Sequence, residues 1–185
     1  MEMAFKTNIK HFFKLKLPIF AIVFLTLFVT SYSFSFASDY VLPYPSSMPG
    51  SKFYTLHRLF EKFENYWYFG NFAKFHYDLK YSDRYLVEAK TLFEYRQYLL
   101  ANDSLDKSNL YFFKAKQSLI DAKNNNKDIS EKQGIFKNAS LKHIEILSAI
   151  RLMVPSEFEW QPEKEKSTKI YIQKKIDESV RMREL

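Results

Sequence analysis

The stretch that decides the fold is FAKFHYDLKYSDRYLVEAKTLFEYRQYLLA, residues 72–101. A large apolar side chain recurs in it at every seventh residue, and a second apolar or small residue follows three positions later. The seventh-residue positions are Phe72, Leu79, Leu86, Phe93 and Leu100, and the companion positions are Phe75, Ser82 and Ala89. Such a repeat places one continuous apolar stripe along a helix. The spacing therefore predicts one long amphipathic helix over residues 72–101.

The residues before this helix predict an extended arm and a first helix. Residues 38–50 contain Pro43, Pro45 and Pro49. Each proline fixes its own φ and restricts the residue before it, so we expect an extended segment. Residues 51–69 then place phenylalanine and leucine at helical spacing. Gly70 can adopt the left-handed conformation that closes a helix.

Two capping signals beyond the long helix predict further helices. Asp103 followed by Asp106 resembles a capping box, and so does Ser130 followed by Gln133. The first pair predicts a helix that ends in the asparagine run 124–126, and the second predicts a helix that ends near residue 154. We expect a linker over residues 155–162 and an amphipathic helix within residues 163–185.

The fold class follows from these helical patterns and from the punctuation of the chain. The chain has three glycines, and its six prolines lie outside the long periodic stretches, which favours helix over a turn-rich β architecture. We predict an all-α fold, an antiparallel bundle of four to five helices with a long second helix, after an N-terminal signal or anchor segment. Its bundle domain is expected over residues 51–154. A solenoid of two-helix repeats is the alternative.

The first 37 residues predict export. Lysines precede an almost wholly apolar run from Leu17 to Val29, and small residues at Ser35 and Ala37 suit a signal-peptidase site. Cleavage would release the domain, whereas an uncut segment would serve as a membrane anchor. Both alternatives predict an extracytoplasmic domain, whether secreted, periplasmic or membrane-anchored.

Composition and charge narrow the classes of function. The chain contains no cysteine, which excludes disulfides and thiolate zinc sites. The net charge is +7, but the leader carries four lysines and one glutamate, so removing it leaves 28 − 4 = 24 basic and 21 − 1 = 20 acidic residues, a net charge of +4. Because both signs alternate along the chain, we expect no nucleic-acid partner.

Motifs that carry catalysis are missing from the sequence. There is no HExxH, no GxSxG and no glycine-rich phosphate loop. Outside the leader, His57, His76 and His143 form no two-histidine pair at helical spacing. We therefore predict that the protein is not an enzyme and that it has no catalytic residues, no metal and no cofactor.

Aromatic residues are the best remaining indication of a binding surface. They make up 18% of the chain, and residues 66–69 form the run Tyr-Trp-Tyr-Phe, which points around every side of a helix. Exposed tyrosine and tryptophan suit interfaces and ligand stacking. A purely compositional origin is the alternative. The candidate partner or ligand contacts are Tyr44, Tyr66, Trp67, Tyr68, Tyr77, Tyr81 and Tyr85.

A candidate structural pair lies on the long helix. Arg84 and Glu88 are four residues apart and can pair along a helix surface, which contributes a few tenths of a kcal/mol. The alternative is that this pair locks a neighbouring helix in place.

The segment around Leu42-Pro43-Tyr44-Pro45 carries a resemblance. It is similar to the mature start of an uncharacterised family of bacterial exported all-helical proteins, which reads Leu-Pro-Tyr-Pro-Gly, two residues and then Pro, with a Leu-Tyr pair soon after. The similarity continues through Phe69-Gly70-Asn71 to Leu79, Arg84, Glu88 and Ala89, and it covers roughly residues 40–122. Ser46 stands where the family has glycine. The resemblance implies export and an all-helical domain, and it implies no activity.

These observations predict a non-enzymatic, extracytoplasmic helical interaction or scaffold protein of the bacterial cell envelope. Its expected partner is another envelope protein or a second copy of itself, with membrane contact through the N-terminal segment if that segment is uncleaved. The alternative is a glycan- or small-ligand-binding domain that uses the aromatic cluster.

Overall fold

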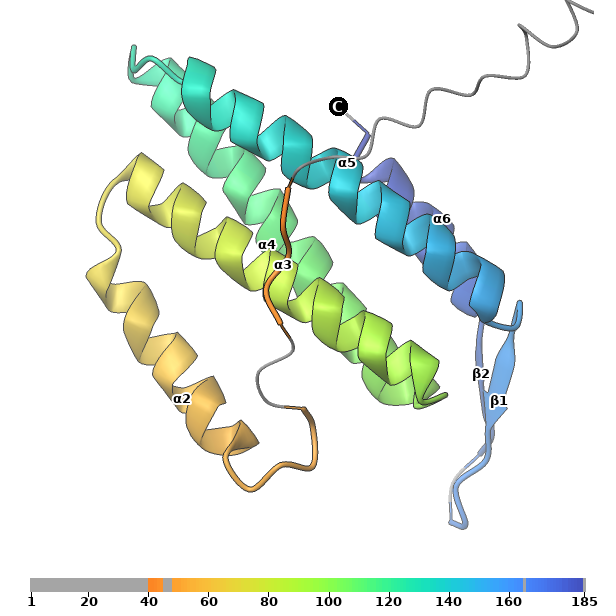
Figure 1. The fold of residues 1–185 in the computed structure, drawn as a ribbon. Coiled ribbons are helices and arrows are strands. Elements are labelled where there is room, and N and C mark those ends of the chain that lie inside the picture. Colours follow the sequence, from red (N-terminus) through yellow and green to blue (C-terminus); the bar gives the residue numbers. More distant parts are fainter. Residues whose placement is uncertain (1–39, 45–47, 165, 185) are drawn as a thin grey trace, which may run out of the picture. The chain divides into compact units, whose positions relative to one another are not determined.

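The computed structural model describes residues 40–44, 48–164 and 166–184. The predicted signal or anchor segment and its cleavage site lie outside these residues. The described part of the chain forms five α-helices, one 3-10 helix and one two-stranded antiparallel sheet (Figure 1), so the predicted all-α fold is confirmed. The elements are α2 (Tyr54–Glu64), η1 (Asn65–Trp67), α3 (Asn71–Glu94), α4 (Tyr98–Asn124), α5 (Ser130–Met153), β1 (Phe158–Trp160), β2 (Thr168–Ile170) and α6 (Ile172–Arg181).

Helices α3 and α4 form a tight antiparallel hairpin at the centre of the fold. Small residues let the two backbones approach closely. The Ser82 hydroxyl donates to the Ser108 carbonyl at 3.0 Å, and the Ser108 hydroxyl donates to the Ser82 carbonyl at 2.9 Å. The apolar stripe of α3 is buried here as predicted, because Leu79, Leu86 and Phe93 are at most 3% exposed.

Helices α5 and α6 close one side of this hairpin and complete the core. One cluster of buried side chains joins Leu86 and Leu105 to Leu147 and Ile150 of α5 and to Ile176 of α6. A second cluster lies towards the other end of the hairpin, where Phe75, Phe112 and Phe136 pack together. Figure 1 shows α2 on the other side of α3 from α5 and α6.

The predicted helix over residues 72–101 is wrong at its C-terminal end. Helix α3 stops at Glu94, and Arg96 adopts a left-handed conformation with φ of +58°. The amides of Arg96 and Gln97 donate to the carbonyls of Phe93 and Leu92 at 3.0 and 2.9 Å, which is a Schellman closure built without glycine. Leu100 and the Asp103–Asp106 pair consequently lie inside α4, which begins at Tyr98.

The other helix starts need smaller corrections. The predicted helix over residues 51–69 is shorter, and η1 follows it. Gly70 has the expected positive φ, at +84°. Helix α5 begins at Ser130 as predicted, but the capping box with Gln133 is wrong. Instead, the Asp128 carboxylate accepts hydrogen bonds from the Ser130 amide at 3.0 Å and the Ser130 hydroxyl at 2.6 Å.

The C-terminal prediction is wrong at its beginning and right at its end. The expected linker contains β1, which pairs with β2 so that Phe158 faces Ile170 and Trp160 faces Thr168. The expected helix therefore starts only at Ile172. Its apolar residues Ile172 and Ile176 are fully buried, so α6 is part of the bundle. No helix among the described residues combines the length and hydropathy needed to cross a membrane.

Candidate interaction surface

Helix α2 places its polar side against the bundle, whereas an amphipathic helix ordinarily buries its apolar side. Tyr54, Arg58, Glu61 and Glu64 point towards the bundle, while the apolar side chains of the same helix point to solvent. We call this outward surface the aromatic face. Its residues are each 48–81% exposed, and they are Phe53, Leu56, Leu59, Phe60, Phe63, Tyr66, Trp67 and Phe69.

Glu61 is the centre of the contact that holds α2 in this orientation. Its side chain is buried and accepts hydrogen bonds from the hydroxyl of Tyr111 at 2.7 Å, from the hydroxyl of Tyr85, and from Arg58 Nη1 at 3.1 Å. The Tyr77 hydroxyl donates to the backbone carbonyl of Glu61 at 2.8 Å. One residue of α2 thus receives donors from both α3 and α4.

A second carboxylate of α2 extends the same contact. Glu64 accepts hydrogen bonds from the hydroxyls of Tyr81 at 2.5 Å and Tyr68 at 3.2 Å, and from the ammonium of Lys80 at 2.7 Å. The rings of Tyr77 and Tyr81 lie 4.7 Å apart between centroids. Tyrosines spaced by four residues on α3 therefore form one row of donors beneath α2.

Glu88 of α3 binds the first residue of α2. Its Oε1 accepts hydrogen bonds from the Tyr54 hydroxyl at 3.0 Å and from the Ser104 hydroxyl at 2.7 Å, and it thereby connects α2, α3 and α4. The guanidinium of Arg58 lies 4.3 Å from the ring centroid of Tyr85 and 5.0 Å from that of Tyr54. Such cation–π contacts strengthen when they are removed from water.

Burial sets the protonation of this cluster. It raises the pKa of Tyr54 and of Tyr77 to about 12, and it raises the pKa values of Tyr81 and Tyr111 further. The hydroxyls therefore stay protonated and act as donors. Burial also raises the pKa of Glu61, although the Tyr111 hydrogen bond and the charge of Arg58 oppose this.

The predicted contact residues divide into two groups. Tyr44, Tyr66 and Trp67 are strongly exposed, and Tyr68 is half-buried. The prediction is wrong for the remaining three, Tyr77, Tyr81 and Tyr85, which are at most 2% exposed. They are buried because their hydroxyls bind α2, so they present no surface to a partner. Sequence reasoning missed the outward residues of α2, which it assigned to the helix stripe.

The Arg84–Glu88 prediction needs a similar correction. Glu88 is 3% exposed, and its Oε1 accepts hydrogen bonds from Tyr54 and Ser104, so it lies inside the bundle and holds neighbouring helices together. The Arg84 guanidinium lies 5.9 Å from the Tyr81 ring centroid.

A shallow hollow lies beside the aromatic face. Its volume is about 930 Å³, and Phe60, Phe63, Glu64, Tyr66, Trp67 and Tyr68 line it. Five of these six side chains are aromatic, and Glu64 supplies a carboxylate. The hollow can therefore accept a flat or apolar group against its rings.

A buried polar chain on the opposite side of α3 was not predicted. Asp83 accepts from the Tyr40 hydroxyl at 2.6 Å and lies 2.7 Å from His143 Nε2. Arg183 Nε donates to His143 Nδ1 at 3.0 Å, so the proton of the neutral imidazole is on Nε2 and points at Asp83. His143 and Arg183 are fully buried. This chain fixes the two ends of the domain onto α3 and α5.

We expect Glu61→Ala to release α2 from the bundle. The change removes the acceptor of Tyr85, Tyr111 and Arg58, and each buried donor left without a partner costs about 1–3 kcal/mol. Hydrogen exchange and limited proteolysis should show faster opening within α2 while α3 keeps its protection. Glu61→Gln retains a carbonyl acceptor and should open α2 less. Unchanged exchange in Glu61→Ala would contradict this role.

The stability of the domain should depend on pH through His143. Burial lowers the pKa of His143, the Asp83 hydrogen bond opposes this, and the charge of Arg183 adds to it. Below the ordinary histidine pKa of about 6.5, His143 therefore binds a proton more readily in the unfolded chain than in the folded chain. The free energy of unfolding should fall with decreasing pH there, by up to about 1.4 kcal/mol per pH unit from this group.

The variant His143→Gln isolates that contribution. Burial raises the pKa of Asp78 to about 6, which acts in the opposite direction, but this group is present in both proteins. Urea titrations between pH 7.5 and 5 should give the steeper loss of stability in the wild type. Parallel curves for the two proteins would exclude His143 as the source.

Fold and surface together define an all-α bundle that carries one inverted amphipathic helix on its flank. The family model described as a domain of unknown function, DUF5667, matches residues 46–157, more than half of the chain. The protein belongs to this family, and the prediction of an uncharacterised helical family is confirmed to that extent. The match covers α2 to α5 and begins after the Leu42–Pro45 signature. Comparisons with curated proteins and with solved structures found no match.

Proposed function

We propose that this protein is a non-enzymatic interaction or scaffold protein of the bacterial cell envelope and that the aromatic face is its contact surface. The observation that carries the proposal is the inverted orientation of α2. Four large apolar side chains of α2 and four of the residues that flank it are left in solvent, while the carboxylates Glu61 and Glu64 of α2 are bound on its inner side. A contiguous exposed apolar patch on a folded domain marks an interaction site.

The way α2 is held supports this use of its outer surface. Hydrogen bonds from Tyr85, Tyr111 and Tyr81 fix the helix before any partner arrives. A surface ordered in advance loses less conformational entropy on binding than a flexible segment does. These hydrogen bonds therefore hold the aromatic face in one orientation.

The extracytoplasmic location is part of the same proposal and rests on the leader. The lysines before the apolar run from Leu17 to Val29 favour export of everything that follows. The aromatic face would then meet components of the envelope.

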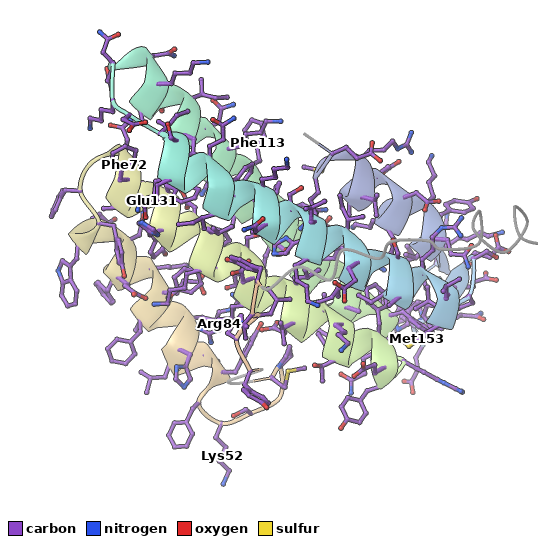
Figure 2. All side chains as sticks on the ribbon, turned by 45° about the horizontal axis from the view of Figure 1, so that its top comes forward. Lys52, Phe72, Arg84, Phe113, Glu131 and Met153 are labelled. Atoms are coloured by element: carbon purple, nitrogen blue, oxygen red, sulfur yellow. The ribbon has the colours of Figure 1, made fainter. Side chains whose placement is uncertain are left out.

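A photo-crosslinking phenylalanine analogue in place of Phe63 tests the proposal in intact cells. Phe63 lies on the aromatic face and is 55% exposed. We expect one dominant crosslinked envelope species, identified by mass spectrometry. The matched control is Phe113, which is 51% exposed on α4 and projects away from the bundle in Figure 2. Equal labelling from both positions, or none from Phe63, would reject the aromatic face as a contact surface.

The hollow beside the aromatic face favours a second candidate function, glycan or small-ligand binding. Trp67 is part of its lining. In a Trp160→Phe variant, Trp67 is the sole tryptophan, so its fluorescence should change when soluble cell-wall fragments are added. No response across a panel of such fragments would remove this candidate.

A further inference from the structure

We infer that the aromatic face docks on the surface of a bilayer that contains anionic lipids. This inference rests on the proposed function, because it names the envelope component that the aromatic face contacts. Three features carry it, namely the charges around α2, the chemistry and length of α2, and the position of α2 in the sequence.

The most exposed charges on α2 and just before it are positive. The two carboxylates of α2, Glu61 and Glu64, point inward and are bound by tyrosines, and Arg58 lies beside Glu61. Lys52 and Lys62 remain exposed beside the aromatic face, and Figure 2 shows Lys52 projecting away from the domain. The outward surface is therefore mainly apolar, and its most exposed charges are cationic. Anionic headgroups attract such basic residues when they lie within a Debye length of the surface.

The residue types on α2 and on η1, which follows it directly, suit the boundary between headgroups and acyl chains. Trp67 and Tyr66 combine an apolar ring with a polar group, and such residues concentrate at membrane interfaces. Phe60 and Phe63 supply apolar area alongside them. With 11 residues, α2 is too short to span a bilayer, so it would lie in the plane of the interface.

The position of α2 in the sequence adds a second membrane signal. The apolar run ends at Val29, and Tyr40 is bound to Asp83 of the bundle, so the chain between Val29 and Tyr40 can span at most about 40 Å when extended. If the leader is retained as an anchor, α2 stays close to the same membrane surface, which raises its effective concentration there. Peripheral proteins commonly need two such signals for stable attachment.

A second copy fits the aromatic face less well. Face-to-face packing of two α2 helices would bring Lys52 and Lys62 of one copy near the same lysines of the other. Neither α2 offers a free carboxylate to meet them, because Glu61 is buried, and Glu64 is 27% exposed and already bound by Tyr81 and Lys80. Like charges brought together without counter-charges oppose association.

The test follows Trp67 in the full chain. The Trp160→Phe variant is reconstituted into phosphatidylcholine vesicles with or without phosphatidylglycerol, and part of the lipid carries brominated acyl chains. In anionic vesicles we expect Trp67 emission to shift to the blue, to be quenched by bromine and to be protected from acrylamide. Quenching should be clearly weaker in phosphatidylcholine alone. Insertion of the leader by itself does not bring Trp67 into contact with acyl chains.

Variants of exposed residues sharpen this test. Phe60→Ser with Phe63→Ser should lower the ratio of docked to undocked α2 at least about tenfold, since each ring loses apolar burial in the interface. Lys52→Glu with Lys62→Glu should remove the preference for anionic lipid. Phe113→Ser, an exposed residue of α4, should leave Trp67 quenching unchanged. Circular dichroism confirms that each variant keeps its helical content.

Three results would overturn the inference. The first is that bromine does not quench Trp67 in anionic vesicles, and the second is that quenching is equal in the two kinds of vesicle. The third is that Trp67 becomes protected from acrylamide without lipid as the protein concentration rises, which would indicate a second copy. The crosslink from Phe63 separates this failure from failure of the proposed function. A protein crosslink with an unquenched Trp67 rejects membrane docking alone, whereas no crosslink of any kind rejects both.

Discussion

Leu86→Asp is expected to abolish the cooperative unfolding transition of this domain. Leu86 is fully buried in α3 and packs in the cluster that joins Leu105, Leu147 and Ile150. The change removes apolar contacts and places a carboxylate inside a buried apolar cluster. We expect a loss of about 5 kcal/mol or more, which is comparable to the whole stability of a typical domain.

Urea denaturation followed by circular dichroism measures this effect. The matched control is Leu152→Asp, because Leu152 of α5 is 86% exposed and receives the same chemical change. The control should unfold within about 0.5 kcal/mol of the wild type. If Leu86→Asp unfolded cooperatively at the same urea concentration as the wild type, the apolar stripe of α3 would not be part of the core.

Arg183→Met is expected to destabilise the domain by about 3–5 kcal/mol, the usual cost of breaking a buried charged pair. Arg183 is fully buried and donates to His143 at 3.0 Å, Asn109 at 2.6 Å and Ser108 at 2.9 Å. Methionine fills a similar volume but donates to none of them. The carboxylate of Asp83 also loses the one positive charge in this buried chain.

Thermal and urea unfolding of Arg183→Met should therefore both shift to lower midpoints. Arg181→Met is the matched control, since Arg181 is exposed two residues earlier. Burial lowers the pKa of Arg183 to about 9, so the side chain remains charged at neutral pH and the comparison is made there. Equal stability of the two variants would mean that the C-terminal segment is not part of the folding unit. Arg183 lies beyond residues 46–157, so the test also asks whether the folding unit extends past the matched family region.

Periodicity predicted those parts of the fold in which each residue's environment depends on near neighbours in the sequence. The apolar stripe of α3 and the extent of α5 follow from helical spacing. The break after Glu94 was missed because its left-handed residue is Arg96, and the sequence carries no glycine there to mark the turn.

The candidate surface was predicted only in part. The sequence indicated an aromatic cluster near residue 67, and Tyr66 and Trp67 are indeed exposed. It also assigned Tyr77, Tyr81 and Tyr85 to that surface, although their spacing of four residues signals a buried row once a partner helix offers acceptors. Glu61 was not singled out, because an isolated glutamate in a helix ordinarily faces water.

The sequence by itself determined the all-α class, the apolar stripe of α3 and the absence of cysteine chemistry, because helical periodicity and composition are local properties of the chain. Only the tertiary structure decided which side of α2 faces outward. An amphipathic helix ordinarily buries its apolar face, but here the hydroxyls of α3 and α4 satisfy Glu61 and Glu64 and so make the polar side the inner one. The orientation of α2 depends on hydrogen bonds between residues up to 50 positions apart, and helical periodicity does not reveal such contacts.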